Sequence, residues 1–180
     1  MLAEGKEELK ETKLRFSTKI IAETALFIAL ATVLSYIKIF TLPQGGSVTA
    51  ASMVPIVWLA LRRGPKVGLF GATLYGIVQL AAGPYIVHPA QVLLDYPIAF
   101  GLLGFAGFFQ KRPYIGVTLG ITGRFVAHLI SGIIFFAIYA GDMNPAVYSA
   151  IYNSYILVEL VISIYVIYLL RASKVLKIYM

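Results

Sequence analysis

Four ionisable residues lie within long apolar runs of the sequence: Asp95, Arg124, His128 and Glu159. A charged side chain in the middle of a bilayer costs about 2.5–3.5 kcal/mol, so each of them needs a partner or a function. Their positions place Arg124 and Glu159 at similar depth, which predicts an internal ion pair with a structural role. Asp95 and its neighbour Tyr96 lie in the third of their run, residues 89–109, that is predicted to be nearest the outer face of the membrane. A carboxylate there is suited to binding a polar or cationic ligand.

Helical spacing on two other runs predicts a pocket beside Asp95. In the apolar run at residues 115–139, four residues at steps of four share one helix face: Arg124, His128, Gly132 and Phe136. In the apolar run at residues 148–170, steps of four, three and four separate Tyr148, Tyr152, Tyr155 and Glu159. Asn153 lies in the third of this run that is predicted to be nearest the outer face of the membrane. A carboxylate, an imidazole, an amide, several phenols and an aromatic wall together suit a flat, polar or cationic small molecule.

Each of these residues also has a simpler interpretation. Asp95 could cap a helix that begins at Tyr96, with Pro97 in the first turn, where proline is favoured. His128 could be a hydrogen-bonded packing residue. Tyrosines near a helix end are common in the aromatic belt at a membrane surface. The residues alone leave these alternatives open.

The composition predicts a helical membrane protein. Hydrophobic residues make up 59% of the 180 residues and charged residues 13%, whereas soluble domains are about a quarter charged. A helical span needs about 20 residues, so the chain has room for six. The predicted fold class is all-α, an integral membrane bundle of six transmembrane helices. We place the spans at residues 20–39, 48–61, 67–80, 89–109, 115–139 and 148–170.

The bundle is predicted to occupy residues 19–172, between cytosolic tails at 1–18 and 173–180. The first residues are charged and lack the apolar core of a signal peptide. The sequence contains no cysteine, which excludes disulfides and thiolate metal sites. We predict neither a metal site nor a cofactor.

The basic residues predict the orientation of the bundle. Of the fifteen Lys and Arg residues, all but Lys38 and Arg124 fall before the first span, between spans two and three or four and five, or after the sixth. The positive-inside rule then places both termini in the cytoplasm of a prokaryote, with the chain in its plasma membrane. This distribution also argues against a nucleic-acid partner. The loops at 40–47, 81–88 and 140–147 face outward, either as lids or as ordinary turns.

Small residues mark close packing. Glycines at 101, 104, 107, 116 and 120 have spacings that allow helices to approach closely. Ala22, Ala25 and Ala29 form a stripe on the first span. This stripe could pack inside the bundle or could dock against a partner membrane protein.

Several separated motifs resemble one known family. They are "GGSVT..SMVPI", "YGIVQ", "HPAQVLLDYPIAFGLLGFAG", "GRFVAHLISGIIFFAIYA" and "AVYSAIYNSYI". In order and spacing they are similar to the thiamine-specific substrate-binding subunits (S components, ThiT) of energy-coupling factor (ECF) transporters, from about residue 22 to 170. The resemblance implies high-affinity capture of thiamine outside the cell. A transmembrane coupling protein and two ATPase subunits would then drive translocation.

The resemblance also implies site residues. Its ligand-binding positions are Asp95, Tyr96, His128, Gly132, Phe136, Tyr148, Asn153 and Tyr85. The stripe Ala22, Ala25 and Ala29 matches the motif that docks on the coupling protein. Two positions depart from the family, which usually has glutamate at Asp95 and tryptophan at Phe136. The only tryptophan, Trp58, lies elsewhere.

The sequence shows no arrangement typical of an enzyme. It contains no nucleophile elbow, no H-E-x-x-H motif and no G-x-x-x-x-G-K-[ST] loop for ATP. We therefore predict a transport protein that is not an enzyme. Two alternatives are an S component or facilitator for another vitamin or precursor, such as riboflavin or hydroxymethylpyrimidine, and, less favoured, a small membrane enzyme.

Overall fold

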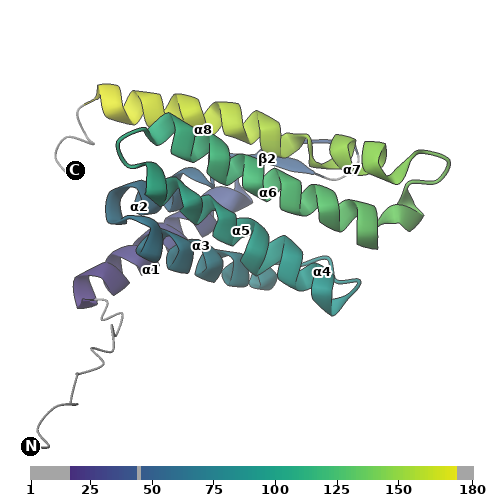
Figure 1. Cartoon of the computed structure of the whole chain (residues 1–180), viewed down its shortest axis with the longest axis horizontal. Coiled ribbons are helices and arrows are strands. Elements are labelled where there is room, and N and C mark those ends of the chain that lie inside the picture. Colours follow the sequence, from purple (N-terminus) through teal and green to yellow (C-terminus); the bar gives the residue numbers. More distant parts are fainter. Residues whose placement is uncertain (1–16, 44–45, 174–180) are drawn as a thin grey trace, which may run out of the picture.

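The computed structural model describes residues 17–43 and 46–173, most of which are helical (Figure 1). The first half contains α1 (Thr18–Tyr36), β1 (Lys38–Thr41), β2 (Ser47–Thr49), α2 (Val54–Arg63), α3 (Pro65–Gln79) and η1 (Leu80–Ala82). The second half contains α4 (Pro89–Leu93), η2 (Leu94–Ile98), α5 (Ala99–Gly101), η3 (Leu102–Phe109), α6 (Pro113–Phe135), η4 (Ala137–Tyr139), α7 (Pro145–Asn153) and α8 (Tyr155–Ala172). Apart from residues 17, 18 and 173, the two predicted tails lie outside the described residues.

Four helical segments of the described chain are long and apolar enough to cross a membrane. They are Thr18–Tyr36, Pro89–Phe109, Pro113–Phe135 and Pro145–Ala172. Helices α2 and α3 have only 10 and 15 residues, fewer than the roughly 20 that a span needs. The structure therefore supports a helical membrane bundle, while the count of six spans stays a prediction.

A short β-hairpin follows α1, where the sequence predicted continuing helix and an all-α fold. Strand β1 pairs antiparallel with β2, with Phe40 opposite Val48 and Thr41 opposite Ser47. The expected extension of the first span to residue 39 is therefore wrong. β-Branched side chains in both segments, together with Phe40 in β1, favour a strand.

The segment Pro89–Phe109 is one helical rod whose geometry changes along its length. His88 caps its start, because the imidazole Nδ1 accepts a hydrogen bond from the Ala90 N–H at 3.1 Å. Pro97 has no N–H to donate, and the rod widens there into the π-helical turn η2. Asp95 lies inside this turn. The alternative in which Asp95 caps a later helix is therefore wrong.

Helices α3 and η3 touch through glycines. A Cβ on Gly104 would come within 2.5 Å of the Leu69 backbone nitrogen, so only glycine permits this approach. The predicted packing role of Gly104 is confirmed.

The described chain begins and ends at the same end of the bundle (Figure 1). The start of α1 and the end of α8 lie there, and α4 and α7 lie at the opposite end. The predicted last span is not one regular helix, because α7 and α8 meet at Ser154.

Candidate ligand-binding site

A cavity of about 410 Å³ lies between the rod Pro89–Phe109, α6, and the α7–α8 segment. All eight residues predicted to bind a ligand line it: Asp95, Tyr96, His128, Gly132, Phe136, Tyr148, Asn153 and Tyr85. The structure thus brings together side chains from four separate stretches of the sequence.

Nine further residues line the same cavity: Gln79, Gln91, Phe100, Arg124, Ser131, Tyr139, Ser149, Tyr152 and Tyr155. Helical spacing in the sequence indicated three of them. Arg124 shares a helix face with His128, and Tyr152 and Tyr155 share one with Tyr148. Gln91 and Ser149 each precede a predicted site residue by four positions, so helical spacing could have identified both.

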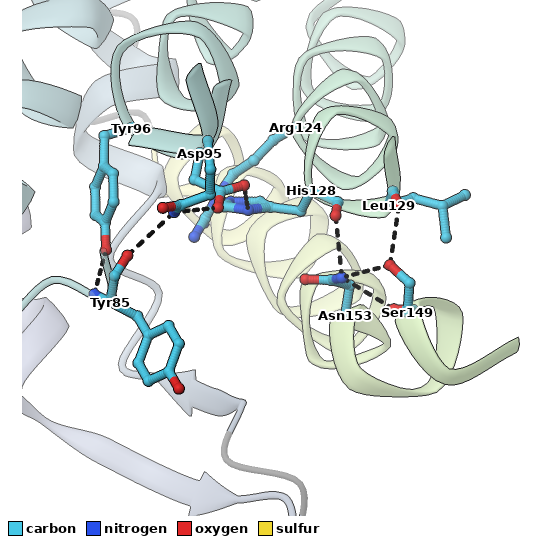
Figure 2. A network of polar contacts seen from close by, with 9 residues as sticks. Tyr85, Asp95, Tyr96, Arg124, His128, Leu129, Ser149 and Asn153 are labelled. Carbon is cyan, nitrogen blue, oxygen red and sulfur yellow. Dashed lines mark hydrogen bonds and ion pairs between the residues drawn. The ribbon is translucent and has the colours of Figure 1, made fainter. Parts of the chain in front are cut away.

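Asp95 is 8% exposed, and both of its carboxylate oxygens are engaged. Oδ2 accepts a hydrogen bond from Nε2 of Gln91 at 2.7 Å, and Oδ1 lies 3.0 Å from Nδ1 of His128 (Figure 2). Nε of Arg124 donates to Nε2 of His128 at 3.4 Å. A guanidinium can only donate, so Nε2 is the accepting nitrogen and Nδ1 carries the proton that His128 donates to Asp95. The imidazole is therefore neutral in this arrangement.

Glu159 ties the hairpin to α8. Its Oε1 accepts from the backbone N–H of Thr49 at 2.7 Å and from the Thr49 hydroxyl at 2.5 Å. The predicted partner, Arg124, is further away, with 3.8 Å between Nη1 and Oε2. The Arg124 guanidinium also lies 4.2 Å from the centre of the Phe100 ring.

These buried groups leave one net negative charge. The Glu159 carboxylate lies 3.8 Å from the Arg124 guanidinium, and the neutral His128 links that guanidinium to the second carboxylate, Asp95. Burying an uncompensated charge is costly, so the cluster is complementary to a ligand with one positive charge.

The wall formed by α6 and α7 is closely packed at Gly132. A Cβ on Gly132 would overlap the Ser149 side chain, so Ser149 occupies the space beside this glycine. The Ser149 hydroxyl donates to the Leu129 carbonyl at 3.0 Å, and Asn153 Nδ2 donates to the Ser149 carbonyl at 2.9 Å. Figure 2 shows the Asn153 amide oxygen on the side away from Ser149, where it can accept from a ligand.

Aromatic residues close the end of the cavity near α4. Tyr85 donates through its hydroxyl to the Tyr139 hydroxyl at 2.9 Å, which raises the pKa of Tyr85. The Tyr85 ring lies 5.7 Å from the Phe136 ring, and the Tyr85 N–H donates to the Tyr96 hydroxyl at 3.1 Å. The 81–88 loop is therefore part of the cavity wall rather than an isolated turn.

The fold and the cavity together define a helical membrane protein with an internal cavity of small-molecule size. Comparisons with known proteins give its family. The sequence model of a family described as "Thiamine transporter protein" matches residues 21–178. The chain belongs to this thiamine transporter (ThiT) family, which is a family of transport proteins and not of enzymes.

Two curated relatives and one solved structure agree with this assignment. The chain is 35% identical to thiamine transporter ThiT of Bacillus subtilis over 152 residues, which cover 73% of this chain and 79% of the relative. It is 32% identical to ThiT of Lacticaseibacillus paracasei over 159 residues, covering 74% and 77% of the two chains. A solved structure of ThiT from Listeria monocytogenes superimposes with a TM-score of 0.78 at 26% identity, covering 86% of this chain and 94% of that one.

Proposed function

We propose that this protein captures thiamine at the outer face of a bacterial plasma membrane, as the S component of an ECF-type importer. The observation that carries the proposal is the buried Asp95 carboxylate in the wall of a cavity lined by aromatic side chains. Thiamine has a matching cationic thiazolium, a flat aminopyrimidine and a hydroxyethyl arm. Membership of the ThiT family supports the choice of ligand.

The cavity residues divide naturally among the parts of thiamine. Asp95 offsets the thiazolium charge or accepts a hydrogen bond from the aminopyrimidine. The edge of that ring is bound by Asn153 and Tyr148. Phe136, together with Tyr85, supplies flat surfaces for stacking on a cationic ring. His128 and Tyr96 reach the remaining polar atoms.

The orientation follows from charge. Arg62 and Arg63 end α2, and Lys111 and Arg112 precede α6, at the end of the bundle opposite α4 and α7 (Figure 1). Basic loops favour the cytoplasmic side. The cavity end would then face outward, with the ends of the described chain toward the cytoplasm.

A purified sample tests the identity of the ligand. We expect mass spectrometry of the protein to find retained thiamine, and calorimetry to show that thiamine binds more tightly than riboflavin or hydroxymethylpyrimidine. Retention of another vitamin, or no binding of thiamine, would contradict the proposal.

The energy for transport would come from separate subunits, because the sequence has no ATP-binding loop. Ala22, Ala25 and Ala29 are all exposed on α1 and leave a smooth surface that suits docking on a coupling protein. The two ATPase subunits would act through that protein.

Placing tryptophan at Ala25 is expected to abolish thiamine uptake by cells that contain the coupling module while leaving thiamine binding within about two-fold, because the bulky ring keeps the helices apart. The matched control is Val161→Trp on the exposed face of α8, which should preserve both properties. Normal uptake by Ala25→Trp would remove this stripe from the docking surface.

Gln91 fixes both the site carboxylate and the 81–88 loop. Besides its bond to Asp95, its Nε2 donates to the Tyr85 carbonyl at 3.1 Å, and its Oε1 accepts from the Val87 N–H at 3.1 Å. The side chain therefore positions the acid and anchors the loop at once.

Replacing Gln91 with leucine is expected to weaken thiamine binding about ten-fold, because a buried carboxylate loses a donor and the loop loses two bonds. Calorimetry measures the affinity, and stopped-flow kinetics should show faster dissociation. In the Asp95→Asn background the effect should shrink, since Gln91 acts partly through that acid. Gln110→Leu is the control, because that amide bonds the Leu61 carbonyl at 2.9 Å away from the cavity. Equal losses in both variants would show a general effect on folding.

A further inference from the structure

Ser131 is a buried polar residue of the cavity wall whose hydroxyl has no partner among the described residues. It is 1% exposed, lies on α6 one turn after His128, and lines the cavity. Serine in a helix commonly donates to the carbonyl three or four residues earlier. Ser154 does so in this protein, with a bond of 2.7 Å to the Ile151 carbonyl. Ser131 does not, so its hydroxyl is an enclosed, unpartnered group on a residue that lines the cavity.

We propose that the Ser131 hydroxyl is a further ligand-binding group that hydrogen-bonds a polar atom of the bound nitrogen heterocycle. This inference rests on the proposed function of the cavity. A hydroxyl can both donate and accept, so it suits the amino group or a ring nitrogen of an aminopyrimidine. The bound ligand then satisfies a polar group that is unsatisfied without it. Ser131 is thereby distinguished from Ser149 and Asn153, whose side chains already donate across to the Leu129 and His128 carbonyls of α6.

The same chain offers a matched control. Ser163 on α8 is 0% exposed and its hydroxyl also lacks a partner among the described residues, but Ser163 does not line the cavity. Alanine at either position removes one unsatisfied buried hydroxyl. Only the change at Ser131 removes a hydroxyl from a residue that lines the cavity.

The test compares Ser131→Ala and Ser163→Ala in the purified full chain. We expect both variants without ligand to unfold at the parent temperature or slightly above it. We expect Ser131→Ala alone to bind thiamine about ten-fold more weakly in calorimetry.

Two results would overturn the assignment of Ser131. One is thiamine affinity within two-fold of the parent, and the other is a fall in the ligand-free unfolding temperature at Ser131→Ala but not at Ser163→Ala, which would show a structural role. If parent and Ser163→Ala also fail to bind thiamine, the proposed function itself fails. The two failures are therefore distinguishable.

Discussion

Replacing Asp95 with asparagine is expected to weaken thiamine binding by about 30- to 100-fold, because a hydrogen bond to a charged group is worth about 1.5–3 kcal/mol. Asparagine keeps the shape of the side chain and removes its charge. The buried cluster then has one carboxylate, Glu159, against one guanidinium, Arg124, and no net charge is left for the thiazolium. Calorimetry on the purified protein measures the change.

Asp142→Asn is the matched control for this prediction. Asp142 lies exposed on the turn before α7, so the same loss of charge should leave the affinity unchanged. If Asp95→Asn binds thiamine within about three-fold of the parent, the acid does not act on the ligand as we propose.

Replacing Glu159 with leucine is expected to lower the free energy of unfolding by about 3–5 kcal/mol, because the Arg124 guanidinium stays buried without its acid. The two donors of Thr49 lose their acceptor as well, which frees the hairpin from α8. Equilibrium unfolding of the ligand-free protein measures this loss.

A second variant separates the charge from the packing. Replacing both Arg124 and Glu159 with leucine removes the unpaired charge and should restore part of the stability, since apolar pairs often substitute for buried ion pairs at little cost. A Glu159→Leu protein as stable as the parent would contradict this account of the cluster. So would a double variant less stable than the single one.

The residues that line the cavity were predictable because helices repeat regularly. Steps of three or four residues on α6 and on the α7–α8 segment put His128, Phe136 and Tyr148 on faces that can meet, and apolar runs locate the helices. Asp95 was identified because a carboxylate within an apolar run is costly and therefore indicates a partner or a function. These features depend only on local order in the chain.

Other features depend on contacts between distant segments. The hairpin is fixed partly by the bonds from Thr49 to Glu159, 110 residues away, which no local pattern shows. The π-helical turn at Pro97 arises because the rod continues through a proline that looked like a helix start. The close contact of Gly132 on α6 with Ser149 on α7 likewise joins two separate helices, so no local pattern shows it.

The most direct test of the central claim compares thiamine with its neutral isostere, in which a thiophene ring replaces the thiazolium. Titration of both into the parent protein should show at least about 30-fold tighter binding of thiamine, and Asp95→Asn should reduce that preference to a few-fold. Equal affinity of the parent for the two molecules would contradict the claim that this buried acid receives the positive charge of the vitamin.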